Sequence, residues 1–171
     1  MENKKFPENF ENPKETIKLV QEGDIKKLAT IYAKVFSEAD PEKPWDEEHS
    51  YDHLMYWFRI QPDMFFGAYN EKNEPVGAIA VRIIPWRRSN RCSAGIIFVD
   101  TKNQKKETGK ILFKTMLEEA VKKYKTTSFE AITFASKEFP LSWYEKLGIL
   151  PDQGAVLVKG SCEEVINNLS K

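Results

Sequence analysis

The sequence has few of the features that mark exported or membrane proteins. It contains only two cysteines, Cys92 and Cys162, in 171 residues, too few and too far apart for a disulfide scaffold or a zinc motif. No apolar run approaches the length of a membrane span, and the polar start at Met1 to Lys5 has no apolar core of a signal peptide behind it. We therefore expect a cytoplasmic protein with no membrane partner.

Neither sign of charge is in excess. The chain carries 26 basic and 26 acidic residues, so its formal net charge is zero, whereas a nucleic-acid-binding protein usually shows a basic excess. We expect no nucleic-acid partner. The length and the hydrophobic fraction of 41% suit one domain with a substantial core. Residues 1–14 are polar and contain Pro7 and Pro13, which predicts a flexible N-terminal arm before a single domain over residues 15–171.

The most informative stretch of the sequence lies between Gly95 and Tyr124. Ile96 to Val99 is a short apolar run with β-branched and aromatic residues, which is typical of a buried strand. Asp100 to Lys106 is wholly polar and cannot be core. From about Glu107, apolar residues recur at the spacing of one helix face, at Leu112, Met116 and Ala120. The pattern therefore predicts a strand, a polar loop and a helix.

This order of elements suits the binding of a phosphate group. The first turn of a helix leaves backbone N–H groups unpaired and carries the positive end of the helix dipole, so the loop before it can hold an anion. Gly109 allows close approach of the backbone, and Lys105, Lys106 and Lys110 add positive charge. Many α/β proteins have a similar basic loop that only faces solvent, and that alternative stays open on the residues alone.

Two motifs resemble a known family. Residues 99–112, with Gln104-x-x-Glu107-x-Gly109, resemble the acetyl-CoA signature of the GNAT superfamily of N-acyltransferases, whose usual form is Gln/Arg-x-x-Gly-x-Gly/Ala. Residues 143–149, Trp-Tyr-Glu-Lys-Leu-Gly-Ile, are similar to the second signature of that superfamily, a short helix ending in Tyr-Glu-Lys-Leu-Gly-Phe. The resemblance covers the order of elements after Glu15, but extends to motifs only between residues 95 and 149.

The remaining elements are expected from periodicity and turn residues. Strands are expected over residues 16–20, 64–69, 76–84, 92–99, 129–135 and 155–159, and helices over residues 25–36, 46–61, 107–124, 138–147 and from Ser161 onward. Asp24 is expected to cap the first helix, and Val165 and Leu169 of the last helix to face inward. This order predicts an α/β (α+β) fold with a mixed, mostly antiparallel sheet and helices on both faces.

The resemblance adds expectations about the sheet and the cofactor. It implies that the central strands at residues 95–99 and 129–135 splay apart, and that the helix from Cys162 replaces the usual final strand. It also implies that acetyl-CoA binds with its pantetheine arm along Ile97, Phe98 and Val99 and its pyrophosphate on the backbone N–H groups of Gln104, Lys105, Lys106, Glu107, Thr108, Gly109 and Lys110. The family usually has glycine where this chain has Glu107, whose side chain we expect to point to solvent.

The second motif contains the candidate catalytic residue, Tyr144. It matches the position where the family often places a tyrosine that protonates the departing CoA thiolate. A phenol suits this task because its pKa of about 10 exceeds the pKa of about 8.5 of a thiol. On the residues alone, Tyr144 is more often an inward aromatic of a short helix, and it is the motif that favours the catalytic role. Lys137 stands where the family commonly has an asparagine that contacts the cofactor arm, so this cofactor-binding position departs from the pattern.

A general base for the acceptor is not evident in the sequence. The strand at residues 92–99 has no carboxylate, although many relatives carry a glutamate there. Substitutes are available on the second predicted helix at Asp46, Glu47, His49, Asp52 and His53, and a water relay is another alternative. The two histidines are more often solvated residues of a polar helix face. Without a defined third ligand they are a weak zinc signal, and no metal is expected.

Taken together, these patterns predict a cytoplasmic N-acetyltransferase that moves an acetyl group from acetyl-CoA to a primary amine by direct attack in a ternary complex. The acceptor is a small molecule or a peptide, and a homodimer is left open. The alternative is a non-catalytic acyl-CoA binding or sensing module. The basic loop from Trp86 to Arg91 has three interpretations: a nucleic-acid contact, a solvated hairpin tip, or a wall of the acceptor site that favours anions.

Overall fold

The structure is a computed structural model, and it describes residues 15–104, 107–133, 138–158 and 160–169. The expected arm at residues 1–14 lies outside the described residues. The chain divides into two compact units, Met1–Ile132 and Thr133–Lys171, and each is described by itself. The expectation of a single domain over residues 15–171 stays a prediction.

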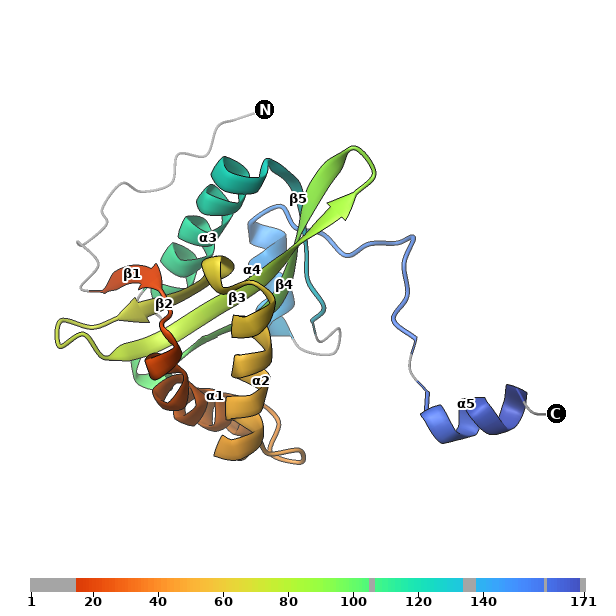
Figure 1. Cartoon of the computed structure of the whole chain (residues 1–171), viewed down its shortest axis with the longest axis horizontal. Helices are drawn as coiled ribbons and strands as arrows, with labels where there is room; N and C mark the ends of the chain where they lie inside the picture. The colour runs from red at the N-terminus through yellow and green to blue at the C-terminus, as the bar shows by residue number, and fades with distance from the viewer. Residues whose placement is uncertain (1–14, 105–106, 134–137, 159, 170–171) are drawn as a thin grey trace. The chain divides into compact units, whose positions relative to one another are not determined.

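The first unit is built on a five-stranded sheet (Figure 1). Its strands follow the chain order: β1 (Thr16–Leu19), β2 (Phe65–Tyr69), β3 (Pro75–Trp86), β4 (Ser89–Val99) and β5 (Thr126–Glu130). The pairings from β1 to β4 are antiparallel, and β5 pairs with β4 in parallel. The sheet is therefore mixed and mostly antiparallel, which confirms the predicted fold class. The stretch from Trp86 to Arg91, expected as a loop, is the tip of the β3–β4 hairpin, in which only Arg87 and Arg88 lie outside the strands.

Three helices pack on this sheet: α1 (Ile25–Ala39), α2 (Glu47–Ile60) and α3 (Thr108–Tyr124). Short 3-10 turns, at Glu22–Asp24, Pro62–Met64 and Thr101–Asn103, lead into or between them. The start of α2 agrees with the prediction, because the carboxylate of Asp46 accepts a hydrogen bond from the N–H of His49 at 2.8 Å. Asp24 stands at the N-cap position of α1 as predicted, but its side chain makes no capping hydrogen bond, because its carboxylate instead accepts from the Tyr69 hydroxyl and the N–H of Gln21.

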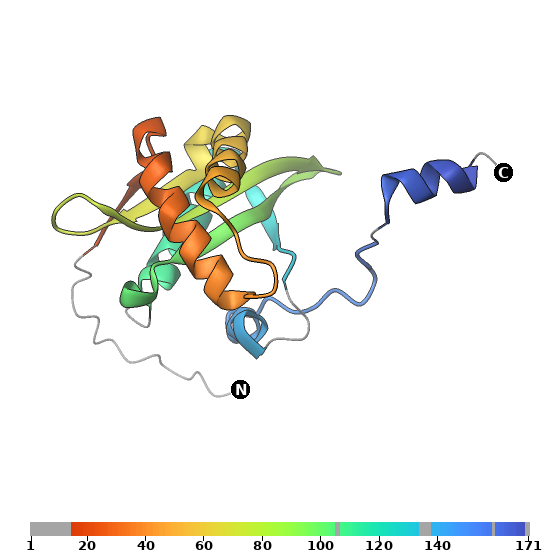
Figure 2. The same cartoon turned by 90° about the horizontal axis from the view of Figure 1, so that it is seen from below.

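A one-residue bulge in β4 decides which helix each of its residues faces. Ala80 pairs with Ile96 and Val81 pairs with Ala94, so Gly95 is an extra residue on β4. Before the bulge, Cys92 points to α3, where its sulfur lies 3.6 Å from that of Met116. After it, Ile96 and Phe98 belong to the core beneath α1 and α2. Helices therefore cover both faces, with α1 and α2 together on one of them (Figure 1, Figure 2).

Gly95 also lets α2 approach the strand closely. A Cβ at this position would lie 2.4 Å from the indole ring of Trp57, closer than carbon atoms approach without displacement. The indole therefore occupies the volume that any other residue at position 95 would need. This contact seats the second half of α2 directly over the bulge.

We predict that Gly95→Ala destabilises the protein by about 1–3 kcal/mol, as overpacking does. Thermal unfolding should move down by several degrees, at about 2–4 °C per kcal/mol for a chain of this size. The matched comparison is Trp57→Leu, alone and combined with Gly95→Ala. If the indole is the cause, the added methyl should destabilise much less in the Trp57→Leu background. Equal effects in both backgrounds would contradict this account.

The C-terminal end of α3 is anchored to the turn before β2. The carboxylate of Asp63 accepts hydrogen bonds from Lys123, Tyr124 and Gln61. Burial by itself raises the pKa of Asp63, but these hydrogen bonds outweigh it and lower the pKa to about 2. The side-chain amide of Asn90 donates to the Tyr124 carbonyl at 2.7 Å. One end of the helix is thus fixed, while its N-terminal end meets the loop after β4.

Three expectations for the later part of the chain are wrong. The strand expected at residues 129–135 is Thr126–Glu130, because pairing with β4 begins directly after α3 ends; residues 131–133 form no strand, and residues 134 and 135 lie outside the described residues. Residues 155–158, expected as a strand, have none and are exposed. Val165 and Leu169 are 50% and 82% exposed instead of inward.

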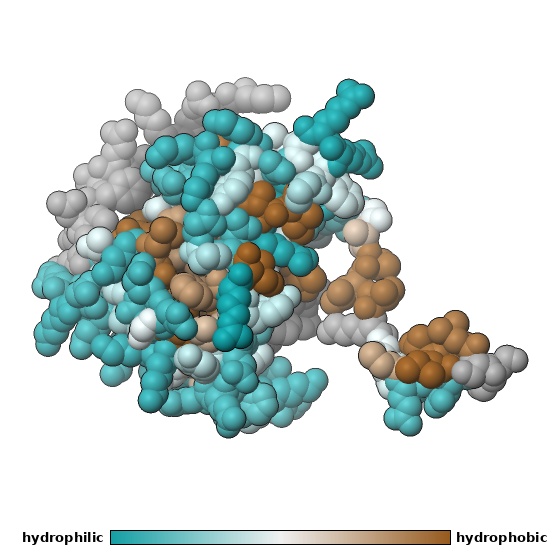
Figure 3. Space-filling model, in the orientation of Figure 1, coloured by the Kyte–Doolittle hydropathy of each residue, from teal (hydrophilic) through white to brown (hydrophobic). Residues whose placement is uncertain are grey.

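The second unit contains two helices, α4 (Glu138–Lys146) and α5 (Cys162–Leu169). Helix α4 stops two residues before Gly148, the predicted terminating glycine, whose φ of 81° is the left-handed conformation that glycine adopts easily. The start of α5 has the first half of the predicted capping box, since the N–H of Glu164 donates to Ser161 Oγ at 3.4 Å. Apolar side chains lie on the surface of α5 (Figure 3).

Candidate active site

The edge of β4 is the first component of the candidate site. Its described pairs with β5 run from Asn90 to Ser93 only, whereas its pairing with β3 continues to Val99. From Ala94 to Val99, the β5 side of β4 therefore has no strand partner among the described residues. This stretch contains Ile97, Phe98 and Val99, the residues expected to hold the pantetheine arm. An open edge of this kind can pair with the amides of an extended ligand.

The loop after β4 is held by its own hydrogen bonds. The N–H of Asp100 donates to the Val76 carbonyl at 2.8 Å, and the side-chain amide of Gln104 donates to the Val99 carbonyl at 2.9 Å. Burial tends to raise the pKa of Asp100, but hydrogen bonds from the N–H of Lys102 and from Lys34, 3.3 Å away, bring it below its usual value. Lys105 and Lys106, both expected at the cofactor, lie outside the described residues.

Helix α3 begins in an unusual backbone conformation. Glu107 is the residue before its first turn and has a φ of 64°, in the left-handed region that favours glycine. Its side chain is 55% exposed and forms an ion pair of 2.7 Å with Lys110. The carboxylate thus faces solvent and a cation, in agreement with the expected orientation. The left-handed backbone also gives a physical reason for glycine being usual at this position.

The space in front of the first turn of α3 is suited to an anion. A Cβ at Gly109 would meet only the Val99 side chain, at 3.9 Å, so packing does not require glycine there and leaves room for close approach. Thr108 is 2% exposed, and its hydroxyl has no hydrogen-bond partner among the described residues. Because that hydroxyl is buried, Thr108 can serve an anion only through its backbone N–H. The residues present therefore fit a phosphate group bound by main-chain donors.

Tyr144 belongs to the second unit, where it is 6% exposed on α4. Burial raises the pKa of its phenol, so the hydroxyl stays protonated at neutral pH. The ring lies 5.2 Å from that of Trp143, and the Tyr144 carbonyl accepts hydrogen bonds from the N–H groups of Leu147 and Ile149. Lys137, the other candidate of this segment, lies outside the described residues.

The candidate bases on α2 fall into two groups. His49 is exposed and its Nδ1 lies 2.7 Å from the Asp46 carboxylate, whose hydrogen bond raises the pKa of His49. Glu47 and Asp52 are also exposed. His53 alone of these five turns toward the core, where its ring lies 5.5 Å from Tyr32 and 5.2 Å from Trp45.

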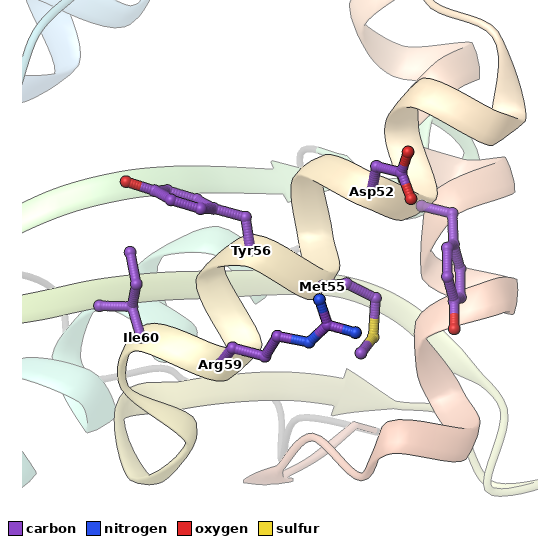
Figure 4. Close-up of a pocket in the computed structure, with 6 residues that line it drawn as sticks. Asp52, Met55, Tyr56, Arg59 and Ile60 are labelled. Atoms are coloured by element: carbon purple, nitrogen blue, oxygen red, sulfur yellow. The ribbon is translucent and has the colours of Figure 1, made fainter.

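The outward face of α2 carries a shallow surface hollow of about 490 Å³ (Figure 4). All the residues that line it belong to this one helix: Tyr51, Asp52, Met55, Tyr56, Arg59 and Ile60. None of the expected cofactor residues is among them. The hollow is therefore separate from the edge of β4 and the start of α3. The described residues contain no group of three or more metal-ligating side chains, and none of their helices is long and apolar enough to span a membrane.

The sequence of this chain matches the acetyltransferase (GNAT) family over residues 26–149. The chain belongs to the GNAT family. It is therefore a GNAT-type N-acetyltransferase, and the acyl donor of this family is acetyl-CoA. A comparison with curated proteins finds none that matches.

Solved structures of low sequence identity share the fold. An integron cassette protein from V. cholerae has a TM-score of 0.71 at 15% identity, covering 92% of this chain and 98% of its own. A possible acetyltransferase from Clostridium difficile 630 has a TM-score of 0.72 at 12% identity, with coverages of 86% and 97%. A ribosomal-protein-alanine N-acetyltransferase from Brucella melitensis biovar Abortus 2308 has a TM-score of 0.67 at 16% identity, with coverages of 86% and 99%.

We predict that Glu107→Gln changes the dissociation constant of CoA by less than about fivefold, because exposed ion pairs contribute only about 0–1 kcal/mol. The carboxylate faces Lys110 and solvent, so its removal should relieve little repulsion. Isothermal titration calorimetry with CoA measures the effect. Glu118→Gln, an exposed residue of the same helix paired with Lys114, is the control. Tenfold tighter binding of Glu107→Gln alone would show that the carboxylate faces the phosphates.

Proposed function

We propose that this GNAT protein transfers the acetyl group of acetyl-CoA to a primary amine of a small-molecule or peptide acceptor, by direct attack within a ternary complex. The observation that supports this most strongly is the edge of β4 from Ala94 to Val99, which has no β5 partner among the described residues, followed later in the chain by the helix start at Thr108, which fits an anion. An extended arm and a pyrophosphate need these two features in this order. A cytoplasmic location stays the expectation from the sequence.

In this proposal the main chain does most of the binding. Acetyl-CoA supplies an activated acyl thioester when bound. The backbone groups of Ile97, Phe98 and Val99 hold the pantetheine amides, and the N–H groups that follow Gln104, up to Lys110, hold the pyrophosphate. The N–H of Gln104 itself already donates to the Asp100 carbonyl at 3.1 Å. Amide N–H groups near Val99 polarise the carbonyl oxygen of the thioester. Binding both reactants together supplies much of the rate, since it replaces a bimolecular encounter with an oriented one.

Tyr144 is proposed to donate a proton to the sulfur as the carbon–sulfur bond breaks. What supports this role is its place in the second motif and its buried phenol, whose pKa lies above its ordinary value. A phenol that stays protonated is ready to donate at neutral pH, and the thiolate that leaves accepts the proton. Lys137 and the two lysines of the loop are proposed as further cofactor contacts.

We predict that Tyr144→Phe lowers kcat by about 100-fold, the lower end of the range for loss of a general acid, while the affinity for acetyl-CoA stays within about twofold. A thiol assay of CoA release measures kcat, and calorimetry measures binding. Tyr51→Phe, which removes an exposed hydroxyl from α2, is the control. An unchanged rate for Tyr144→Phe with intact cofactor binding would remove the proton-donor role.

The competing function, a non-catalytic acyl-CoA binding or sensing module, makes a different prediction for the wild-type protein. CoA release is to be measured with polyamines, aminoglycosides, amino acids and peptide N-termini as acceptors. The aminoglycosides and the peptide N-termini cover the chemistry named by structural neighbours, which include the alanine N-acetyltransferase above and an aminoglycoside acetyltransferase from a soil metagenome. Binding of acetyl-CoA without turnover across this panel would favour the module.

A further inference from the structure

His53 lies in an aromatic cluster formed by α1, α2 and the segment between them. Its imidazole centroid is 5.5 Å from the ring of Tyr32 and 5.2 Å from that of Trp45. Tyr32 in turn makes an edge contact with Phe98 of β4, at 5.3 Å and 87°. One ring therefore separates His53 from the residue that is proposed to hold the pantetheine arm.

The surroundings of His53 are uncharged on the side that faces the sheet. Helix α1 presents Tyr32 and Phe36, β4 presents Phe98, and the segment before α2 presents Trp45. Burial raises the pKa of Tyr32 to about 12, so this hydroxyl carries no charge at neutral pH. The charged neighbours on α2 itself are on the exposed face: Asp52 lines the surface hollow, and His49 pairs with Asp46.

This environment keeps the imidazole neutral and available. Burial lowers the pKa of His53 below its usual value of 6.5, and no opposing charge is among the causes. Its ring nitrogens have no hydrogen-bond partner among the described residues, whereas Nδ1 of His49 is hydrogen-bonded to the Asp46 carboxylate. A neutral imidazole with an unoccupied lone pair is the form that a general base requires at pH 7.

Helix α2, which carries His53, also contacts β4 directly. One turn later on the same helix, Trp57 lies against Gly95, while the contact through Tyr32 relates His53 to Phe98. Trp57 thus places this part of α2 beside Gly95, in the stretch of β4 that has no β5 partner among the described residues. The rings of Tyr32 and Trp45 are fixed there, the latter by two hydrogen bonds between its backbone and Ser37 Oγ.

We propose that His53 is the general base of the acetyl transfer, an inference that rests on the function proposed above. The amine nitrogen attacks the thioester carbon, the carbon–nitrogen bond forms and the carbon–sulfur bond breaks. The proton lost by the nitrogen goes to His53, directly or through one water, and the departing sulfur takes a proton from Tyr144. The products are an acetamide and CoA thiol. His53 then supplies the base that the carboxylate-free strand β4 does not.

The first test uses the fact that the chain has only two histidines. Their Cε1–H signals can be followed by NMR between pH 4.5 and 8.5, and the variants His53→Gln and His49→Gln assign them. We expect His53 to titrate below pH 6.5 and His49 above it, and the His53 signal alone to shift when CoA is added. Titration of His53 above pH 6.5, or a His53 signal that CoA leaves unmoved, would overturn the proposal. This measurement needs no turnover.

The second test is the pH dependence of kcat/KM for the best amine of the acceptor panel. In wild type, the slope of log kcat/KM against pH should steepen by about one unit below the pKa of His53. His53→Gln should lower kcat by about 100-fold or more and lose this steepening, with the dissociation constant of CoA unchanged. His49→Gln should behave as wild type. If the pH profile of His53→Gln keeps this steepening, a group other than His53 is the base that titrates, and this result would contradict the proposal.

The two proposals can fail separately. Absence of turnover with every acceptor in wild type removes the proposed function, whatever the histidines do. Full turnover in His53→Gln, with the wild-type pH profile, removes only the role of His53 and leaves the acetyltransferase intact. Thermal unfolding and near-ultraviolet circular dichroism of both variants show whether the aromatic cluster has kept its packing, and the NMR titration of wild type does not depend on that result.

Discussion

The constraint on which the candidate site depends is the unequal pairing of β4. This strand pairs with β3 along its whole length, whereas its pairs with β5 among the described residues run only from Asn90 to Ser93. Buried backbone N–H and C=O groups nearly always have partners, so this edge needs side chains, water or a ligand to satisfy it, and the Gln104 amide supplies one such bond at the Val99 carbonyl. The bulge at Gly95 lies just after the last pair with β5, where it bends the strand and changes the face of each residue that follows.

The charges near this edge are arranged so that few of them oppose an anion. Asp100 is paired with Lys34, and Glu107 with Lys110. The left-handed backbone at Glu107 costs about 1–2 kcal/mol for a residue other than glycine, and its exposed ion pair returns at most about 1 kcal/mol. Stability therefore gives no reason for a glutamate at this position. What its side chain does accomplish is to keep Lys110 beside the first turn of α3, where a mobile cation complements main-chain donors.

Much of this fold could be predicted from the sequence because local signals agree with tertiary structure there. The apolar run, the polar loop and the helical spacing locate β4 and α3, and Asp46 marks the start of α2. The sequence pattern places β5 too late in the chain, because the bounds of this strand depend on its pairing with β4, which no local pattern encodes. Residues 155–158 look like a strand by composition, yet a strand also needs a partner. The last helix has an apolar face, but nothing in its sequence says whether that face is covered.

The candidate site, like the fold, could be predicted from the sequence only in part. The motifs single out Gln104, Gly109 and Tyr144 as candidates, and the left-handed φ of Glu107 explains why the first motif usually has glycine at that position. The bulge at Gly95 was not predictable, because a glycine beside an apolar run has many uses. Nor was the contact of Trp57 with that glycine, since Trp57 reads equally well as a pocket wall or as plain packing. Both features are contacts between segments far apart in the chain.

His49 and His53 show most clearly what spacing leaves undetermined. The two histidines are four residues apart on one helix, so the sequence gives them the same interpretation. In the structure, however, His49 is paired with a carboxylate, whereas His53 lies among uncharged rings. The two pKa values therefore move in opposite directions, and the linkage to stability follows. For His53 the folded state binds a proton less readily than the unfolded chain, so its contribution to stability is complete above about pH 6.5 and declines as the pH falls through that value. Lowering the pH protonates the His53 imidazole and so places a charge in an apolar cluster. This protonation removes the neutral form that a base requires and also weakens the packing of α2. The ring contacts with Tyr32 and Trp45 that favour the neutral form of His53 also hold its side chain in place.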